Sequence, residues 1–469
     1  MQPTQALDQQ GQRAALLMVL LNGFSMPMML SAVNVALPSI ADELAMDAVS
    51  LSWIPMAYLM ASAALVLTFG RIADMFGRKR MYLIGTVGLI VTSILAAYAN
   101  SGAMIIACRL LQGVSAAMVY GTHIAIISSV YPPAQRGRMI GLTVSVIYVG
   151  LTCGPFLGGW LIGLFGWRAA FLVHVPTSVA ALIVGIFMVK AEWRAEHAGR
   201  FDYVGALLYT IAIVALMVGI SSLPQWSSVF LIALGGVGFW LFFHHQHNRR
   251  DPLFDVSLFY TSRVFTLSCI ASVLMYTATF SNVVMISLHL QYLQEMTPMA
   301  AGVVLMAQPI VMALVSPYAG KLSDRVEARV IASIGMAITA IGLALIATID
   351  TTTPLPFTVV YLMTIGLGFS LFSSPNANAI MGSVASHQYG IAGSSVATMR
   401  VIGQVTSMGI VAMVFALLLG PVQITPDIYP QLEHALRWCF GVSAAFCLPG
   451  IYLSLVRGRS RACKSASGE

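Results

Sequence analysis

Apolar runs separated by short polar segments repeat along the whole chain. Each run is close to the length of about twenty residues that a helix needs to cross the hydrocarbon core of a bilayer. The runs lie near residues 14–37, 50–69, 81–98, 103–122, 139–163, 168–189, 203–222, 228–246, 264–290, 299–319, 330–349, 355–380, 391–418 and 434–456. The pattern predicts an all-α integral membrane protein with fourteen spans.

The composition agrees with this pattern. Of the 469 residues, 58% are hydrophobic and 9% are charged, and the mean hydropathy is +0.85; charged residues make up about a quarter of an ordinary soluble chain. The net charge is +7, but the lysines and arginines gather in alternate loops, where they meet anionic lipid headgroups, so no nucleic acid partner is expected. The same alternation predicts a cytoplasmic (inner) membrane protein with both termini cytoplasmic.

The spans fall into two sets of six with a pair between them. The expected parts are an N-terminal cytoplasmic tail (1–13), a first six-helix half (14–189), a linker with two extra spans (190–263), a second half (264–456) and a C-terminal cytoplasmic tail (457–469). The six cysteines form no Cys-x-x-Cys pair and five of them lie in apolar runs. Neither a disulfide, a metal site nor a cofactor is therefore expected.

The loop between the second and third spans carries an ordered set of charges, Gly70-Arg-Ile-Ala-Asp74-Met-Phe-Gly77-Arg78-Lys79-Arg80. Its glycines permit a sharp turn and close helix approach. Its single carboxylate is suited to pair with a cation or with a helix N-terminus. A degenerate copy runs from Gly320 to Arg329, with Glu327 at the position of Gly77. Such a repeat is expected of a rocking transporter with its substrate site between two halves.

The stretch from Gly70 to Arg80 resembles the loop between the second and third spans of the major facilitator superfamily, whose fold has two six-helix halves. The two extra central spans make the chain similar to the fourteen-span drug:proton antiporter branch of that superfamily. The resemblance implies a gate that opens and closes with alternating access. The residues assigned to this gate are Gly70, Asp74, Gly77, Arg78, Lys79, Arg80, Gly320 and Asp324.

The fifth span has small residues at four-residue spacing. Gly150, Gly154 and Gly158 lie on one helix face, and Pro155 interrupts the backbone hydrogen bonds, which predicts a thin helix against which another span can pack. Ordinary small-residue packing is the simpler interpretation. The segment Gly154-Pro-x-x-Gly158-Gly159 also resembles the motif that the superfamily carries in its antiporters, which favours antiport over symport.

The fourth span contains Arg109-Leu-Leu-Gln112-Gly113, similar to the superfamily's Arg-x-x-Gln-Gly motif. An arginine within a membrane helix normally faces the bundle interior, and the resemblance implies a role for Arg109 in proton coupling. For Arg400, packing and substrate contact both stay open. Histidine titrates near neutral pH, so coupling through His123 or His174 is a further hypothesis beside ordinary packing roles.

The first span departs from the family pattern at one position. Ser31-Ala-Val-Asn34-Val-Ala-Leu-Pro38 resembles the opening signature of the branch, in which many members carry an Asp five residues before that Asn. Here this position is Met29, and none of the seventeen acidic residues lies at the middle of a predicted span. A buried carboxylate is the usual proton carrier and partner of cationic drugs, so the interior arginines favour neutral or anionic amphiphiles.

Polar and aromatic residues at mid-membrane depth are candidates for the wall of a substrate cavity, with interhelical hydrogen bonding or packing as the alternative role of each. These candidates are Met29, Asn34, Tyr58, Tyr148, Asn282, Gln308, Asn376 and Asn378.

Together the motifs predict a secondary active transporter that exports amphipathic small molecules or drugs by proton-linked antiport and alternating access. The alternative is an exporter of a specific endogenous neutral or anionic metabolite, such as a siderophore or a lipid-like product, without obligatory proton coupling. An enzyme is not expected, because the sequence shows no paired carboxylates at membrane depth, metal constellation or phosphate-binding loop. The chain is expected to be a monomer in the lipid bilayer, and a periplasmic adaptor is left open as a partner.

Overall fold

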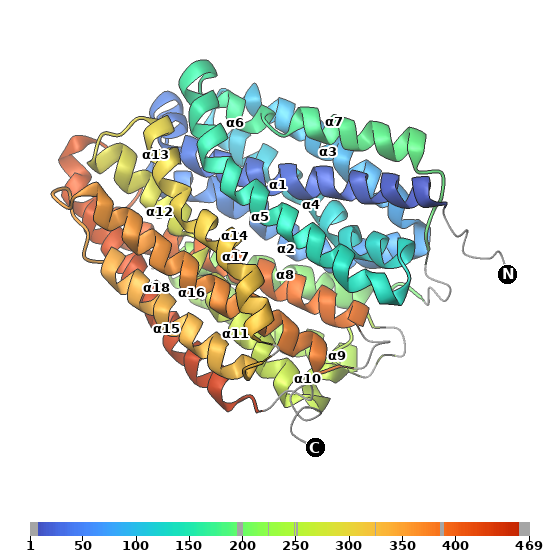
Figure 1. Cartoon of the computed structure of the whole chain (residues 1–469). Coiled ribbons are helices and arrows are strands. Elements are labelled where there is room, and N and C mark those ends of the chain that lie inside the picture. Colours follow the sequence, from blue (N-terminus) through green and yellow to red (C-terminus); the bar gives the residue numbers. More distant parts are fainter. Residues whose placement is uncertain are drawn as a thin grey trace.

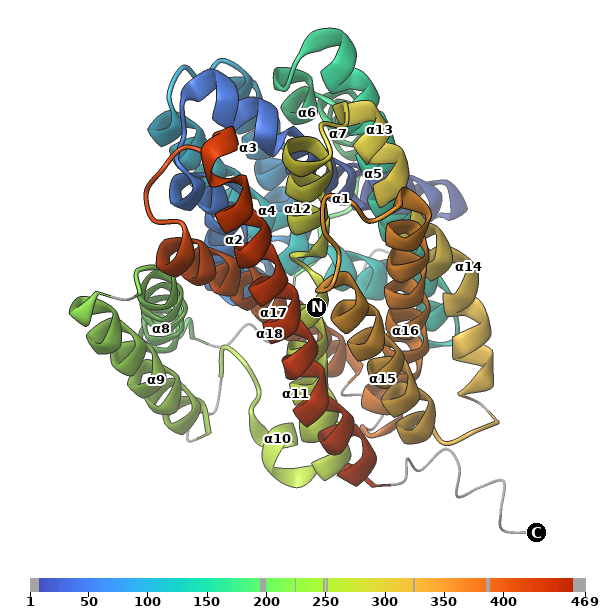
Figure 2. The same ribbon diagram turned by 90° about the vertical axis from the view of Figure 1, so that its left-hand side faces the viewer.

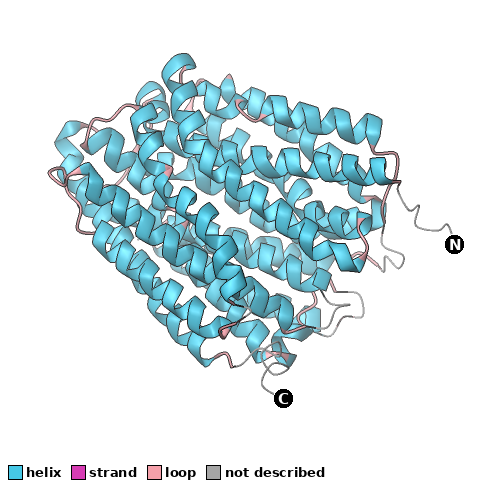
Figure 3. Ribbon diagram, in the orientation of Figure 1, coloured by secondary structure: helices cyan, strands magenta, loops and turns pink. Residues whose placement is uncertain are grey.

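The structure is a computed structural model that describes residues 8–194, 200–223, 225–247, 249, 252–323, 325–384 and 389–458. Over these ranges it is built of helices, and its single β contact is an isolated bridge between Asp47 and Gln423 (Figure 3). Fourteen helical segments have the length and apolar composition to cross a membrane. The all-α membrane architecture predicted from the apolar runs is therefore confirmed.

The first six spans are formed by eight helices, two of which are short and one of which is a π-helix (Figure 1). They are α1 (Gln9–Leu44), α2 (Ala48–Phe76), α3 (Arg78–Ala97), α4 (Gly102–Val130), α5 (Pro133–Phe165), and, in the sixth span, α6 (Arg168–Leu172), α7 (Val175–Ile183) and η1 (Val184–Met188). The extra pair is α8 (Tyr203–Ser221) and α9 (Trp226–His247), followed by the short helix α10 (Ser257–Thr261).

The last six spans are interrupted more often. They are α11 (Arg263–Thr279) with α12 (Asn282–Leu288) and η2 (His289–Leu293); α13 (Pro298–Leu305) with α14 (Ala307–Leu322); α15 (Ala328–Ile346); α16 (Leu355–Gly382); α17 (Tyr389–Leu418); and η4 (Pro426–Ile428) with α18 (Tyr429–Val456). Helix α1 begins and α18 ends at the same end of the bundle (Figure 1). We call this end the terminal side and the opposite end the far side.

Several helices run beyond the predicted spans, and α1 shows why. The apolar run suggested an end near Pro38, yet the helix continues to Leu44 with Pro27 and Pro38 inside it. A proline removes only one backbone hydrogen bond, and neighbouring helices support the rest of a membrane helix. The helix ends where Ala45 takes a left-handed conformation with φ of 49° and its N–H bonds to the Ala41 carbonyl.

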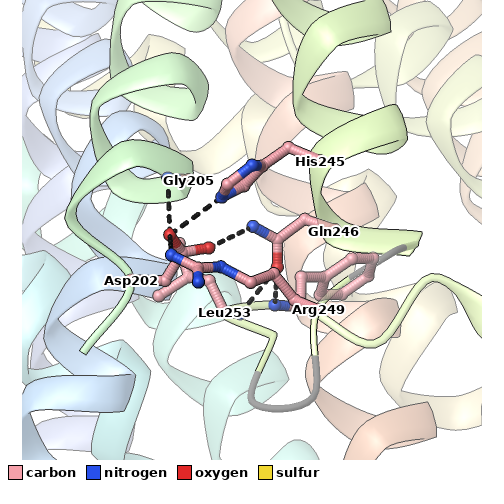
Figure 4. A network of polar contacts seen from close by, with 7 residues as sticks. Asp202, Gly205, His245, Gln246, Arg249 and Leu253 are labelled. Carbon is pink, nitrogen blue, oxygen red and sulfur yellow. Dashed lines mark hydrogen bonds and ion pairs between the residues drawn. The ribbon is translucent and has the colours of Figure 1, made fainter. Parts of the chain in front are cut away.

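The extra pair lies at the edge of the bundle (Figure 2). Helix α8 packs on α2 and α17, one from each set of six, and the Thr210 hydroxyl donates to the Ala64 carbonyl over 3.0 Å. On the terminal side, a buried carboxylate joins the start of α8 to the end of α9 (Figure 4). Asp202 accepts hydrogen bonds from the Gly205 amide at 3.0 Å and from Gln246 Nε2 at 2.7 Å.

Gln246 extends this network toward the last six spans. Its side-chain oxygen accepts from the Leu253 amide at 2.6 Å, in the connection that leads to α11. His245 Nε2 lies 3.0 Å from Asp202 Oδ1, so this histidine belongs to the network. Burial alone would raise the pKa of Asp202, but the hydrogen bonds from Gly205, His245 and Gln246 lower it to about 2. The carboxylate is therefore charged at neutral pH.

Candidate functional site

A central cavity lies between the two sets of six spans. It has two adjoining compartments of about 1300 Å³ and about 750 Å³, with shared lining residues that come from both sets. The shared residues are Leu30, Tyr148, Leu151, Tyr276, Arg400 and Gln404. The larger compartment reaches toward the terminal side, where it is lined by Ile127, Ile140 and Gly393. A cavity in this place suits a small amphipathic ligand, since most of its wall is apolar.

The structure brings part of the predicted set to this cavity. Asn34 and Gln308 line the smaller compartment, His123 lines the larger one, and Tyr148 and Arg400 line both. Tyr148 also connects the two sets, because its hydroxyl lies 3.1 Å from the Ser373 hydroxyl. The resulting wall carries several polar atoms around an apolar interior.

Five predicted cavity residues lie elsewhere. Met29, Tyr58 and Asn282 have no exposed surface and are enclosed by neighbouring helices. Asn376 is buried and donates to the Ser268 carbonyl and the Ser272 hydroxyl. Asn378 is exposed and donates to the Ser323 hydroxyl over 2.8 Å. Asn376 and Asn378 thus make interhelical hydrogen bonds, whereas both polar atoms of the buried Asn282 side chain have no described partner.

Arg457 explains the position of Asn376. This arginine lies in the predicted C-terminal tail, yet it is 1% exposed and donates to the Asn376 side-chain oxygen and to Ser268 Oγ. Burial, with the positive charge of Arg329 nearby, lowers the pKa of Arg457 to about 10, so it stays protonated. Its place directly after the last apolar run made it indistinguishable from a tail cation, because no sequence pattern signals a partner on another helix.

Arg109 and Gln112 form the core of a buried polar network in the first six spans. Arg109 donates to the Ile54 carbonyl at 3.0 Å and to Gln112 Oε1 at 2.9 Å, and its guanidinium carbon lies 4.4 Å from the centre of the Tyr58 ring. Gln112 Nε2 donates to Ser93 Oγ at 2.6 Å. This arginine is fully buried, and these contacts supply partners for a charge that would otherwise be very costly there.

The network continues to His174. Ser93 Oγ lies 3.3 Å from His174 Nε2, and His174 Nδ1 lies 3.1 Å from the Phe171 carbonyl oxygen. Since the carbonyl can only accept, Nδ1 carries the proton and Nε2 accepts from Ser93. Three of the five residues predicted for proton coupling are thus joined by hydrogen bonds, whereas His123 and Arg400 line the cavity.

Met29 lies against this network. Its sulfur is 3.9 Å from Gln112 Nε2, and the side chain has no exposed surface. The position that carries an Asp in many members of the branch therefore faces the Arg109–Gln112 pair here and not the cavity. A carboxylate at this place would meet the buried arginine before it met a ligand.

The glycines of the fifth span allow α5 and α1 to touch along their backbones. A Cβ atom added at Gly150, Gly154 or Gly158 would overlap α1 at Phe24, at Met28 and Ser31, or at Ala32. The α1 residues follow the same spacing of about four as the glycines. Close approach of the two helices thus requires glycine at all three positions.

The other face of α5 touches the second set of spans. A Cβ atom at Gly159 would overlap the Pro298 carbonyl, and one at Gly302 would overlap the Pro155 carbonyl. Hydrogen bonds join the two sets further toward the far side. They run from Gln291 Nε2 to the Val35 carbonyl (2.9 Å), from the Tyr292 hydroxyl to Asp42 (3.0 Å), and from the Ala48 amide to the Val422 carbonyl (2.9 Å).

The loop between α2 and α3 is fixed on the terminal side. Arg78 pairs with Asp74 at 2.7 Å and also donates to the Ser129 hydroxyl on α4. Glu192, which sequence analysis did not single out, accepts from the Lys79 and Arg80 amides at 2.9 and 3.2 Å. It thereby caps the start of α3, where free N–H groups attract a carboxylate. Its place just after the sixth span, between Lys190 and Arg194, was the one available signal.

Two glycines of this loop have different roles. Gly77 has φ of 132°, and a Cβ atom there would meet the Glu192 carboxyl group. Gly70 lies directly against Gly121 of α4. In the second copy, the one described side chain within 4 Å of a Cβ atom at Gly320 is Ser374, and Glu327 pairs with Arg329. Asp324 lies outside the described residues.

Fourteen spans, a cavity between two sets of six, and tight packing of α5 on α1 and α13 together define a membrane transporter fold. The sequence profile of the Major Facilitator Superfamily matches residues 19–408 and 268–468, and the chain belongs to this family. The resemblance to its drug-efflux branch is confirmed by curated relatives.

The riboflavin transporter RibZ of Clostridioides difficile (strain 630) is 27% identical over 91% of this chain and 93% of its own. The multidrug resistance protein Stp of Mycobacterium tuberculosis (strain ATCC 25618 / H37Rv) is 30% identical over 86% of this chain and 75% of its own. The methylenomycin A resistance protein of Bacillus subtilis (strain 168) is 28% identical over 94% of this chain and 92% of its own. A crystal structure of a POT family transporter in complex with 5-aminolevulinic acid shares the fold. Its TM-score is 0.73 and its sequence identity is 13%, and the match covers 98% of this chain and 100% of the transporter.

Proposed function

We propose that this protein is a secondary active transporter that exports amphipathic small molecules across the cytoplasmic (inner) membrane by alternating access, with protons as the coupling ion. Residues 14–189 and 264–456 would be the two rocking halves, 190–263 the linker between them, and both termini would be cytoplasmic. The observation that best supports this proposal is a cavity that reaches the terminal side, while hydrogen bonds join the two sets of six spans on the far side. With cytoplasmic termini, this would be the arrangement of a transporter open toward the cytoplasm.

The loop from Gly70 to Arg80 would act as the cytoplasmic gate in this cycle. Its ion pair and the Glu192 cap tie α2, α3 and the segment after the sixth span into one unit. Such a unit can move as a rigid body, and the degenerate copy at Gly320 would be the looser counterpart in the second half.

Proton coupling is proposed to run through His174. A neutral His174 accepts the hydrogen bond from Ser93, which in turn accepts from Gln112, the partner of Arg109. A proton added to His174 Nε2 would convert that acceptor into a donor, so the Ser93 hydroxyl would have to turn its own proton away and accept from both His174 and Gln112. Protonation and the position of the buried arginine would thus be linked without a carboxylate.

The second candidate is export of a specific neutral or anionic metabolite. It is favoured by the cavity wall, in which no Asp, Glu or Lys occurs among the described lining residues. The relatives support both readings, since one is named a riboflavin transporter and others are named for drug resistance.

The test uses the full chain in proteoliposomes loaded with a pH-sensitive dye. Under an imposed pH gradient, addition of an amphiphile should move protons in the wild type and in His434→Gln, an exposed far-side histidine that serves as the control. His174→Gln should reduce the proton flux at least tenfold while substrate exchange without a gradient persists. Substrate exchange without proton movement in the wild type would contradict the coupling and leave the metabolite exporter as the better description.

A further inference from the structure

The described wall of the central cavity carries one formal charge. Among the described residues that line its two compartments, Arg400 alone is charged. Its guanidinium has five N–H donors, and no described side chain or carbonyl accepts from it. Arg109, by contrast, donates from Nε and Nη1 to the Ile54 carbonyl and to Gln112, and its Nη2 alone is left without a described partner. A guanidinium in a largely apolar cavity is costly when it has no partner, so its retention there indicates a ligand that supplies one.

Further polar atoms around the cavity also lack partners. Both ring nitrogens of His123 are buried without a hydrogen bond, and so are Asn34 Oδ1 and Gln308 Oε1. The three side chains are at least nine-tenths buried. Buried polar atoms are nearly always paired in folded proteins. Here the unpaired atoms line the compartments on which Arg400 borders, as expected of a site whose partners arrive with the ligand.

The remaining wall favours a flat, apolar body. Tyr148 and Tyr276 border both compartments, and Phe280 borders the smaller one. The Tyr276 ring packs edge-on against Phe369, with ring centres 5.5 Å apart. Aromatic side chains of this kind hold planar ring systems by stacking and edge contacts.

We propose that Arg400 and His123 form an anion-binding site in the central cavity and that it selects planar amphiphiles that carry an acidic group such as a carboxylate, sulfonate or phenolate. The anionic group accepts from the Arg400 guanidinium and from one His123 nitrogen, and the aromatic body lies along Tyr148 and Tyr276. Donor groups at the other end of the molecule reach Asn34 and Gln308. A lipophilic cation in the same place would face Arg400 with no counter-charge. The inference rests on the proposed function only in that the cavity receives a substrate.

The test compares two dyes of similar shape and opposite charge, fluorescein and rhodamine 123. Binding is measured by fluorescence anisotropy with the full chain in nanodiscs of phosphatidylcholine, a zwitterionic lipid that adds no net charge. The wild type should bind fluorescein at least tenfold more tightly than rhodamine 123. Arg400→Gln should lose about tenfold of the fluorescein affinity, the size of one charge-assisted bond, and should bind rhodamine 123 more tightly than the wild type, because the repelling charge is gone. Arg400→Lys should recover part of the loss, and His123→Ala should cost a few-fold.

Arg437→Gln is the matched control, since Arg437 pairs with Glu433 away from the cavity. Unfolding temperatures of all variants show whether a loss of binding is a loss of fold. Equal binding of both dyes, no fluorescein binding by the wild type, or wild-type affinity in Arg400→Gln would overturn the anion site. Fluorescein binding without proton movement would contradict the coupling alone, and proton movement without charge preference would contradict the anion site alone.

Discussion

Arg109 in the first six spans and Arg400 in the last six both lie within the membrane-spanning bundle, but their surroundings differ. Arg109 is enclosed, donates to a carbonyl and a glutamine, and lies over an aromatic ring. Arg400 borders the cavity and has no described hydrogen-bond partner. A buried charge with partners serves the protein's own architecture, whereas one without them is available to a ligand. The two arginines look alike in the sequence, but substitution of Arg109 should therefore lower stability, whereas substitution of Arg400 should lower ligand binding.

The largest effect is expected from Arg109→Leu. This change leaves the Ile54 carbonyl and Gln112 Oε1 without their donor in a buried site, at a cost of about 3 kcal/mol of folding free energy. Arg400→Leu removes no hydrogen bond within the protein and should change stability by less than about 1 kcal/mol. Unfolding in detergent, followed by circular dichroism, measures both. Equal losses would mean that the two arginines have the same role.

A smaller but still large effect is expected from Gly159→Val. A ligand role for Arg400 requires a cavity that closes on the far side, and the added side chain would strike the Pro298 carbonyl at that closure. Overpacking of this kind costs about 1–3 kcal/mol. Here it would destabilise the arrangement that is closed on the far side, so transport should fall at least tenfold. Gly163→Val on the same helix is the control, because nothing lies within 4 Å of its Cβ position. Similar transport by both variants would exclude a role for this contact.

Met29→Asp sharpens the division between network and cavity. The new carboxylate would lie beside Gln112, within reach of the buried arginine. Proton flux per substrate should rise, because the pair adds a titrating group, while the preference for anionic over cationic dyes should stay as in the wild type. Dye binding and proton flux in the same vesicles measure the two effects. Tight binding of rhodamine 123 by this variant would show that position 29 reaches the cavity after all.

Glu192→Gln extends the comparison to the two terminal-side loops. Loss of the charged cap should cost about 1 kcal/mol. It should also speed amide hydrogen exchange at Lys79 and Arg80. Exchange measured by mass spectrometry at the start of α15, in the second copy, serves as the internal reference. Unchanged exchange at α3 would show that the carboxylate does not hold this turn.

The smallest effect is expected from pH at the extra pair. The pKa of Asp202 is lowered to about 2, so its contribution to stability is complete above its usual value near 4 and is lost only as the pH falls toward 2. Protease cleavage between α9 and α11 should therefore be unchanged from pH 8 to pH 5. Asp202→Asn should increase it at every pH. A cleavage rate that climbs between pH 7 and pH 5 would contradict the role assigned to the Asp202 carboxylate.

Much of the fold could be predicted because a bilayer imposes one length on every span. The fourteen apolar runs and the glycine spacing in the fifth span are local signals, and each has a counterpart in the structure. The ends of the helices were harder to predict from the sequence, since polar residues continue a helix beyond the membrane until a cap such as Ala45 ends it.

The site was only partly predictable, because depth in the membrane does not give direction around a helix. Asn34 and Gln308 face the cavity, but Asn282 and Asn376, at similar depth, face other helices. The partners of Asn376 and of the α3 cap, Arg457 and Glu192, come from distant segments and carry no motif. Such pairings depend on tertiary contacts that a single sequence does not reveal.

The central claim, alternating access around the cavity, is tested most directly by spin-label distances on the two sides of the bundle. With the six cysteines replaced, one label pair goes on the exposed residues Phe76 and Tyr318 of the terminal side, and another on Tyr98 and Phe357 of the far side. On addition of substrate across pH 5 to 8, one distance should shorten while the other lengthens. Distances that stay fixed, or that change in the same direction, would contradict the account.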